Sequence, residues 1–268
     1  MPAPGDTANM ALFCDFENVA LGVRESQHEK FDIKLVLERL LLKGSIVVKK
    51  AYCDWERYKS FKAPMHEASF ELIEIPHVRQ SGKNSADIRL VVDALDLCYT
   101  KAHVNTFVII SGDSDFSPLV SKLRENAKQV IGVGVKNSTS DLLTANCDEF
   151  IFYDDLVREK PGKRQQRKKA ESKPASDGGP KDGEDKTEQA LEMVMQTVDA
   201  LIAERGAEEK IWGSMVKQAL KRRNPGFNES YYGFSSFSKL LDEAASRNML
   251  QLEHDEKSGG YIVRSVAH

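Results

Sequence analysis

Residues 108–117 read VIISGDSDFS, a run of apolar residues that stops at Ser111 and is followed by Asp113 and Asp115. The run predicts a buried strand, because apolar, β-branched residues suit a strand that is covered on both faces. Two like charges beside the end of such a strand are unfavourable unless a proton or a cation joins them. The stretch therefore predicts a parallel sheet with a charged site at one edge.

Alternating strand-like and helix-like patterns surround this stretch. Strands are expected at residues 10–16, 45–55, 71–78, 105–111, 130–135 and 149–155. Helices are expected at residues 32–42, 57–70, 85–101, 118–127 and 140–146. Short strands separated by helices predict an α/β fold, with a doubly wound parallel sheet that is covered on both faces. Such sheets bind ligands outside the carboxyl ends of their strands.

Four aspartates are expected at that edge of the sheet: Asp15, Asp87, Asp113 and Asp115. Each of them alone has a simpler explanation, as a helix cap or a turn residue. Ser85 is the expected N-cap of the helix that carries Asp87. Ser117 with Pro118 already marks the start of the helix that follows Asp113 and Asp115. Capping therefore leaves the convergence of the four carboxylates unexplained.

Carboxylates that converge without histidine or cysteine form a site of hard oxygen ligands, which suits Mg²⁺ or Mn²⁺ rather than zinc. An ion of this kind lowers the pKa of a bound water and neutralises charge on a phosphate group. Phosphoryl chemistry needs little more than this positioning and neutralisation. The acidic edge therefore predicts a metal-dependent site that acts on phosphate esters.

Other acid-bearing α/β sites fit less well. The DxDxT pattern of dehalogenase-type phosphatases and the DxSxS pattern of von Willebrand-type sites are missing after the first strand, where residues 15–18 read DFEN. A Toprim-type site, with a glutamate after the first strand and a later DxD, is a weaker competitor. No GxxxxGK[ST] or GxGxxG motif occurs, so the sequence does not support a nucleotide-binding phosphate loop.

The stretches that carry the four aspartates read DFENV at 15–19, KNSADIRLVVD at 83–93 and SGDSDFSPLV at 111–120. Together with a later run through Ser140, Leu143, Asp148 and Phe150, they resemble the NYN domain, the LabA-like branch of the PIN-like nucleases. The resemblance covers about residues 9–157 and implies a PIN-like fold with metal-dependent endoribonuclease activity. It places the family's catalytic and metal-binding positions on Asp15, Asp87, Asp113 and Asp115.

The resemblance also implies supporting positions at Asn18 and Asp93, and Ser111 and Ser140 are expected to orient groups near the same edge. On an ideal helix Asp93 lies about 600° beyond Asp87, about a third of a turn from facing it. Asp93 is therefore expected to have a supporting or structural role rather than to bind the same ion directly.

A basic segment of low complexity divides the chain. Residues 160–186 contain no aliphatic residue larger than alanine, so burial cannot offset the entropy lost on ordering, and a flexible linker is expected over 158–186. Residues 1–157 hold 18 Lys and Arg against 23 Asp and Glu, whereas residues 158–173 hold 8 against 2. The basic run 163–169 is either a solubilising tether or a contact for a polyanionic strand.

Residues 187–266 predict a second, smaller domain. Helices are expected at 190–206, 213–225 and 234–249, followed by two short strands within 250–266. This order is typical of a winged helix. The stretches NPGFNESYYGFSSFSKLLDEA at 224–244 and GGYIV at 259–263 resemble the LOTUS (OST-HTH) domain, which implies binding of RNA, including G-rich or structured RNA.

Residues expected to contact RNA in this domain are Lys221, Arg222, Arg223, Tyr231, Tyr232 and Lys239. They combine a basic corner at a helix end with aromatic rings that can stack on bases. Residues 187–268 hold 10 Lys and Arg against 12 Asp and Glu, so the domain has no overall basic field. Tyr232 alternatively joins a core with Phe234 and Phe237, and recognition of a protein partner is the main rival role.

The remaining composition limits the class of protein. No stretch is apolar over the roughly 18 residues that a membrane span needs, and the first residues do not resemble a signal peptide. The four cysteines lack CxxC spacing, so buried thiols are expected rather than disulfides or a zinc site. We therefore expect a cytoplasmic protein.

A homodimer, if the protein forms one, is expected to use an exposed strand edge or the helix at 187–205.

These observations predict a two-domain RNA-processing protein. In this interpretation an N-terminal Mg²⁺- or Mn²⁺-dependent endoribonuclease domain is joined by a basic linker to a winged helix that binds single-stranded or structured RNA. The alternative is a catalytically inactive regulator, whose acidic edge binds metal or RNA without cutting and whose second domain recruits a partner.

Overall fold

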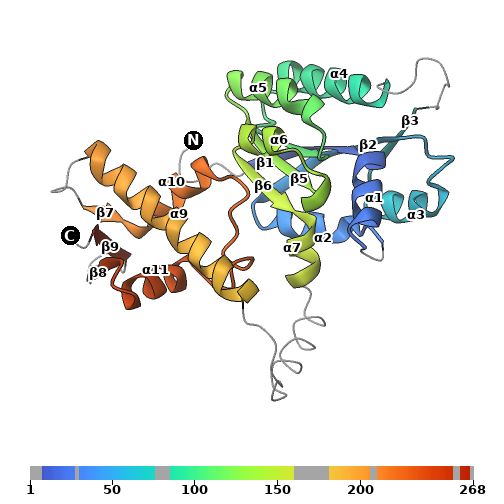
Figure 1. The fold of residues 1–268 in the computed structure, drawn as a ribbon. Coiled ribbons are helices and arrows are strands. Elements are labelled where there is room, and N and C mark those ends of the chain that lie inside the picture. The colour runs from blue at the N-terminus through green and yellow to red at the C-terminus, as the bar shows by residue number, and fades with distance from the viewer. Residues whose placement is uncertain are drawn as a thin grey trace, which may run out of the picture. The chain divides into compact units, whose positions relative to one another are not determined.

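The computed structural model describes residues 8–27, 30–75, 85–159, 181–205, 210–255 and 260–265 (Figure 1). The chain divides into two compact units, residues 1–165 and 166–268. Across the described ranges, no helix is both long enough and apolar enough to cross a membrane. All four cysteines are buried free thiols, as their spacing predicts.

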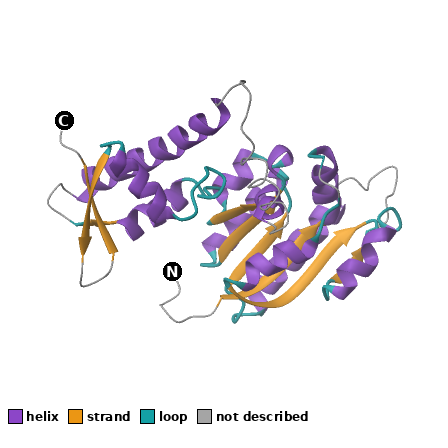
Figure 2. Cartoon of the chain, turned by 90° about the horizontal axis from the view of Figure 1, so that it is seen from below, coloured by secondary structure: helices purple, strands orange, loops and turns teal. Residues whose placement is uncertain are grey.

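A parallel sheet of six strands forms the centre of the first unit (Figure 2). Its strands are β1 (Ala8–Asp15), β2 (Gly44–Cys53), β3 (Glu71–Glu74), β4 (Thr106–Ile110), β5 (Gln129–Gly134) and β6 (Glu149–Phe152). They lie in the order β3-β2-β1-β4-β5-β6, and every neighbouring pair is parallel. This is the predicted doubly wound sheet, in which the order reverses between β1 and β4. Sheets of this kind bind ligands at that reversal.

Helices cover both faces of the sheet (Figure 1). One face carries α1 (Phe16–Glu25), α2 (Ile33–Leu41), α3 (Lys59–Glu67) and α7 (Tyr153–Glu159). The other face carries α4 (Ser85–Thr100), α5 (Ser117–Glu125) and α6 (Asp141–Asn146). Side chains of β1 alternate between the two cores: Met10, Leu12 and Cys14 enter the first, and Ala11 and Phe13 enter the second.

Several boundaries differ from the prediction. The sequence pattern does not predict α1 or α7, and it extends β6 to residue 155, whereas the strand ends at Phe152. Tyr153 is the first residue of α7. Its ring is buried, and its hydroxyl accepts a hydrogen bond from the backbone N–H of Asp32 at 2.8 Å. Ser85 is the first residue of α4 rather than the cap before it. Residues 76–78 of the third predicted strand lie outside the described residues.

The second unit is a small winged helix with its own core. It consists of α9 (Lys181–Arg205), β7 (Ile211–Trp212), α10 (Gly213–Arg223), α11 (Phe237–Ser246), β8 (Leu250–Asp255) and β9 (Gly260–Ser265). The three strands form an antiparallel sheet in the order β7-β9-β8. Val194, Leu220, Leu240 and Val263 join the helices and the sheet in one buried cluster.

Two boundaries of this unit also differ from the prediction. α9 begins at Lys181, so the predicted linker at 158–186 overlaps its first turns, and residues 160–180 lie outside the described residues. The third predicted helix, 234–249, is shorter because Ser236 caps α11 by accepting a hydrogen bond from the backbone N–H of Lys239 at 3.3 Å. β7 is a further strand that the pattern does not predict.

Candidate functional site

The carboxyl ends of β1 and β4 bring Asp15 and Ser111 side by side. β1 pairs with β4 so that Cys14 lies opposite Ile110, and the next residue of each strand reaches the same edge. Asp15 is only 6% exposed, and its Oδ2 accepts a hydrogen bond from Ser111 Oγ at 2.9 Å. Its Oδ1 accepts from the backbone N–H of Asn18 at 3.4 Å, which caps α1. Asp15 is therefore held rigidly between the sheet and a helix.

Hydrogen bonds connect this aspartate to the turn after β4. Ser111 Oγ, which donates to Asp15, also accepts from the backbone N–H of Asp113 at 3.2 Å. Asn18 Oδ1 accepts from the backbone N–H of Gly112 at 2.9 Å. One hydroxyl and one amide thus join segments that are 96 and 94 residues apart in the sequence. The predicted supporting residues Asn18 and Ser111 lie in this network.

Ser140 holds the same turn from the other side. Its backbone N–H donates to the Gly112 carbonyl at 2.9 Å, and its hydroxyl caps α6 by accepting from the backbone N–H of Leu142 at 3.2 Å. Gly112 has no room for a side chain, because a Cβ there would lie 2.4 Å from the carbonyl oxygen of Ser138. The turn after β4 is therefore clamped between α1 and the segment before α6.

Asp113 and Asp115 lie in the clamped turn and the short helix that follows it. The 3₁₀ helix η1 (Ser114–Phe116) precedes α5, and Asp113 Oδ1 caps it by accepting from the backbone N–H of Asp115 at 2.9 Å. The prediction that Ser117 caps this helix is wrong, since Ser117 is already helical and no side chain caps α5. The chain enters α5 through a 3₁₀ turn, so the cap is needed earlier and Asp113 supplies it.

The carboxylates influence one another electrostatically. Burial, together with the charges of Asp87 and Asp113, raises the pKa of Asp15 from 3.8 to about 7, against the lowering effect of the hydrogen bonds from Ser111 and Asn18. Burial also raises the pKa of Asp87 to about 6, with added contributions from Asp113, Asp115 and Glu17. The structure thus brings the four predicted aspartates into the same electrostatic environment, although they come from β1, α4 and the turn after β4.

Glu17 is a fifth acidic residue of this edge, and sequence analysis does not select it. It lies in the first turn of α1, two residues after Asp15, and its Oε1 forms an ion pair with Arg57 Nη1 at 3.0 Å. Its charge is one of those that raise the pKa of Asp87. Glu17 stands in the stretch DFEN at 15–18, but its position at this edge follows only when a helix starts directly after Asp15.

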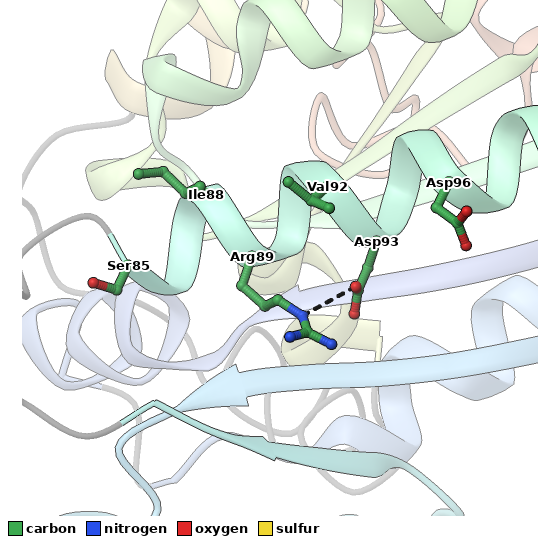
Figure 3. A pocket seen from close by; sticks show the side chains of 6 residues that line it. All are labelled: Ser85, Ile88, Arg89, Val92, Asp93 and Asp96. Carbon is green, nitrogen blue, oxygen red and sulfur yellow. Dashed lines mark hydrogen bonds and ion pairs between the residues drawn. The ribbon is translucent and has the colours of Figure 1, made fainter.

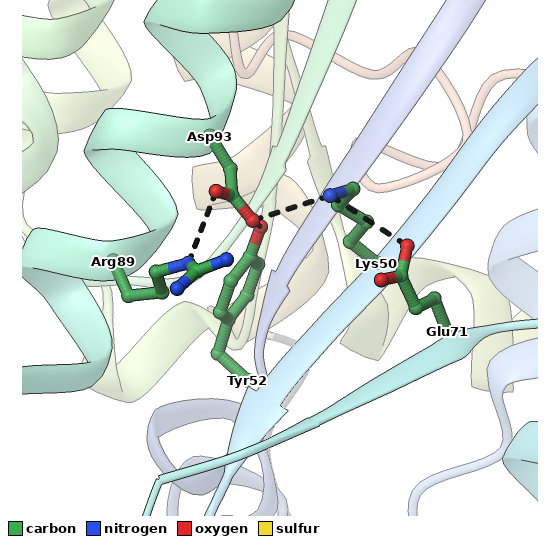
Figure 4. A network of polar contacts seen from close by, with 5 residues as sticks. All are labelled: Lys50, Tyr52, Glu71, Arg89 and Asp93. Carbon is green, nitrogen blue, oxygen red and sulfur yellow. Dashed lines mark hydrogen bonds and ion pairs between the residues drawn. The ribbon is translucent and has the colours of Figure 1, made fainter.

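Asp93 belongs to a different network on the face of the sheet that α4 covers (Figure 4). Its carboxylate accepts hydrogen bonds from Tyr52 Oη at 2.8 Å, Lys50 Nζ at 3.2 Å and Arg89 Nε at 3.1 Å. Lys50 also lies 3.6 Å from Glu71. Burial acts to raise the pKa of Asp93, but these hydrogen bonds and charges hold it below its usual value. These partners tie α4 to β2, which is a structural role.

The acidic edge has the donor chemistry of a magnesium or manganese site. Its oxygen donors are carboxylates, a hydroxyl and an amide. The pKa values of Asp15 and Asp87 are raised first by burial and second by repulsion between the carboxylates, and a cation relieves that repulsion. Within the described ranges, no three His, Cys, Asp or Glu side chains are already grouped around one ion position. Mg²⁺ commonly uses only one or two carboxylates and keeps several waters, so the donor set fits it.

Comparison with known families agrees with this geometry. The family model of the NYN domain matches residues 9–154, which is more than half of the chain. The chain belongs to the NYN domain family. Its first unit is an NYN domain with a PIN-like, nuclease-like fold, and the OST-HTH/LOTUS domain matches residues 189–262 of the second unit. A LOTUS domain implies RNA binding.

Solved structures add support for the fold. The crystal structure of VPA0982, a protein of unknown function from Vibrio parahaemolyticus RIMD 2210633, is 25% identical with a TM-score of 0.51. The similarity covers 57% of this chain and 98% of that chain. The Aeropyrum pernix ORC1 protein in complex with DNA is 12% identical over 97% of this chain and 84% of that one, but its TM-score of 0.23 is too low for any inference. A search of curated proteins found no match.

The basic corner of the LOTUS domain forms the last turn of α10. Lys221 is half-buried, whereas Arg222 and Arg223 are exposed. Arg223 Nη1 donates a hydrogen bond to the carbonyl of Gln196 in α9 at 3.1 Å. This contact ties the Arg223 side chain to α9, and Arg222 and Arg223 both stay exposed to solvent.

The two tyrosines of the LOTUS domain differ in their surroundings. Both lie in the turn before α11, where Tyr232 stacks on Phe227 with ring centroids 5.3 Å apart, and Tyr231 meets Tyr232 edge-on at 4.9 Å. Burial raises the pKa of Tyr232. Tyr232 therefore belongs to the margin of the core, as the alternative interpretation expects. Lys239 is exposed and lies 3.3 Å from Asp242, and its contact with RNA stays a prediction.

Proposed function

We propose that this chain is a metal-dependent endoribonuclease, in which the NYN domain hydrolyses RNA phosphodiester bonds and the LOTUS domain binds the RNA. The observation that carries the proposal is the join between β1 and β4, where Asp15 and the backbone of Asp113 share the hydroxyl of Ser111. This join holds acidic groups at the end of a doubly wound sheet where ligands bind.

The residues that would hold Mg²⁺ or Mn²⁺ are Asp15, Asp87, Asp113 and Asp115. When bound, such an ion supplies a water of lowered pKa and neutralises charge on the phosphate. Asp15 is the most rigid of the four, since both of its oxygens are hydrogen-bonded and its side chain is buried. Asp115 is exposed and therefore open to an incoming phosphodiester.

Supporting residues keep this arrangement in place. Asn18 fixes the position of Gly112, and Ser140 holds the carbonyl of the same glycine. Glu17 holds Arg57 beside the acidic edge, where its half-exposed guanidinium can bind a phosphate of the RNA. These groups would hold the acidic edge and the bound RNA in position without touching the metal or the reacting bond.

RNA binding outside the NYN domain would come from the basic corner of the LOTUS domain, Tyr231 and the basic run at 163–169. Arginines contact phosphates and an accessible aromatic ring stacks on an unpaired base, so single-stranded or structured RNA is the expected substrate. The basic run would add phosphate contacts whose strength falls steeply with salt. Its deletion should weaken RNA binding at low salt without changing metal affinity.

Cleavage of end-labelled single-stranded and structured RNA, with Mn²⁺ or with EDTA, tests the proposal. Wild-type protein should cut only with the metal, and Asp113→Asn should lower the rate by about 100-fold or more, the loss typical of removing one charge-stabilising group. Asparagine is as good a helix cap as aspartate, so this variant keeps the η1 turn. Glu38→Gln, on the exposed side of α2, is the matched control and should cut like wild type.

The same assay identifies the alternative role. RNA that binds in the presence of Mg²⁺ or Mn²⁺ but is not cut, with equal affinity in wild type and Asp113→Asn, would show a non-catalytic RNA-binding regulator. A calorimetric titration that detects no Mn²⁺ uptake by wild-type protein would remove the metal from the proposal.

A further inference from the structure

α4 presents an apolar stripe to solvent. Ile88, Val92 and Tyr99 are 63%, 56% and 64% exposed, and Leu95 between them is half-buried. These residues are spaced by four, three and four positions, which is the spacing of the apolar seam in a coiled coil. The opposite side of the helix, at Leu90, is fully buried against the sheet. The stripe is therefore additional to the face that α4 uses for its own fold.

A shallow hollow runs along the stripe (Figure 3). Its lining residues are Ser85, Ile88, Arg89, Val92, Asp93 and Asp96. Ile88 and Val92 project on one side of the helix, whereas Arg89 and Asp93 point toward the sheet (Figure 3). The six residues form two overlapping sets, 85/88/89/92 and 89/92/93/96. In each set the residues are spaced i, i+3, i+4 and i+7, as in a hole that receives a side chain from a facing helix.

We propose that α4 pairs with α4 of a second copy of the chain in an antiparallel, two-fold symmetric dimer. When the symmetry axis passes between Val92 and Leu95, the Tyr99 side chain of each copy faces Ile88 of the other and enters the first hole. Leu95 of each copy then faces Val92 and enters the second hole. One surface is sufficient, because a two-fold interface uses the same patch on both subunits.

Charges beside the seam favour this partner and this direction. Arg89 and Asp96 lie on the same flank of the stripe, one helical repeat of seven residues apart. In the antiparallel pair, Arg89 of each copy approaches Asp96 of the other, which gives two opposite-charge contacts. Asp96 is exposed and, within the part of the chain that the structure describes, no cation lies at ion-pair distance from it. Arg89 contacts Asp93 through its Nε at 3.1 Å, but its side chain is still 57% exposed, so its Nη groups can reach Asp96 of the other copy.

Of the two surfaces that the sequence suggests for a homodimer, the helix at 187–205 is less suitable. The helix at 187–205 packs Leu191, Val194 and Val198 into the core of the LOTUS domain, so its apolar face is already covered. α4 is 16 residues long and spans about 24 Å, so a contact of this helix pair lies at the small end of protein interfaces, near 1,200 Å². We therefore expect a reversible dimer that dissociates in the range of about 10–100 μM.

Sedimentation equilibrium of the full chain, without RNA or metal, tests this proposal. Val92→Asp places a charge in the centre of the seam and should weaken the dimer by more than about tenfold, which is ~1.4 kcal/mol. Leu42→Asp is the matched control, because Leu42 is 81% exposed but lies at the end of α2, and it should leave the dimerisation constant unchanged. Unfolding curves of both variants verify that they are folded.

A charge exchange tests the direction of pairing. Asp96→Arg alone should weaken the dimer, and Arg89→Asp combined with Asp96→Arg should restore it, since Lys50 and Tyr52 still hold Asp93. The proposal is overturned by wild-type protein that stays monomeric up to about 200 μM, about twice the upper end of the expected range. It is also overturned if Val92→Asp leaves the dimer intact, or if the dimer of the double variant is no more stable than the dimer of Asp96→Arg. RNA cleavage is measured separately, so the two proposals fail independently.

Discussion

Asp15→Asn should stabilise the NYN domain while it abolishes the proposed activity. Asparagine has nearly the same shape as aspartate, and its side-chain oxygen can accept one of the hydrogen bonds that Ser111 and Asn18 donate to Asp15. It carries no charge, however, and the charge is what the folded chain disfavours. Burial and the neighbouring Asp87 and Asp113 raise the pKa of Asp15 from 3.8 to about 7.

The size of the effect follows from that difference. The folded chain binds a proton at Asp15 more tightly than the unfolded chain does, so the contribution of Asp15 to stability is most favourable below about pH 4 and is lost as pH rises toward 7. Above pH 7 the carboxylate is ionised in both states and the full penalty applies. At about 1.36 kcal/mol per pH unit, the interval from 3.8 to about 7 corresponds to about 4 kcal/mol.

Urea unfolding in EDTA at pH 4 and pH 8 measures this difference. At pH 8 the free energy of unfolding of Asp15→Asn should exceed that of wild type by up to about 4 kcal/mol. This difference in stability should vanish near pH 4. Glu38→Gln, at an exposed position of α2, should show no such pH-dependent gain. Mn²⁺ at 100 times its dissociation constant should stabilise only the wild type, by about 2.7 kcal/mol. A variant that is no more stable than wild type at pH 8 would refute the assigned electrostatics.

Five further substitutions separate structural roles from functional ones. Asp93→Ala should lower the free energy of unfolding by about 3 kcal/mol in urea, because it removes the partner of Arg89 and the nearer of the two carboxylates beside Lys50, and the folded protein should still cut RNA. Gly112→Ala should lower the cleavage rate at least about tenfold, because its Cβ meets a carbonyl oxygen at 2.4 Å, and RNA binding by the LOTUS domain should persist in a filter-binding assay. Arg57→Gln should weaken RNA binding and reduce its salt dependence by about one phosphate contact in a titration series. Tyr231→Ala should weaken RNA binding by about 1–3 kcal/mol at unchanged stability, whereas Tyr232→Ala should mainly lower the melting temperature, since its ring stacks on the core.

Local patterns were sufficient for most of the architecture. The strands are apolar runs of four to ten residues and the helices between them are amphipathic, so their order predicts the doubly wound sheet. The pattern fails at α1 and α7, which begin directly at strand ends without a loop signal between them. It also fails at the start of α5, because the 3₁₀ turn capped by Asp113 has no periodicity of its own.

The composition of the site could also be predicted in part. Strand order places Asp15, Asp113 and Asp115 at one edge, since the carboxyl ends of parallel strands share it, and Asp87 joins them electrostatically from the first turn of α4, while their role in binding a metal stays a prediction. Glu17 was missed, because its place beside Asp87 depends on the exact start of α1. The apolar stripe of α4 was also hidden in the sequence, where its residues are indistinguishable from those that face the core.

The sequence by itself determined the fold class, the division into two domains and the presence of several carboxylates at one edge of a sheet. These properties depend on residue type and on short periodic patterns, which are local in the chain. Only the tertiary structure decided which carboxylates share a hydrogen-bond network, that Asp93 belongs to a separate one, and which face of α4 stays exposed. Those outcomes depend on contacts between residues far apart in the sequence, such as Asp15 with Ser111, and burial there sets both geometry and charge.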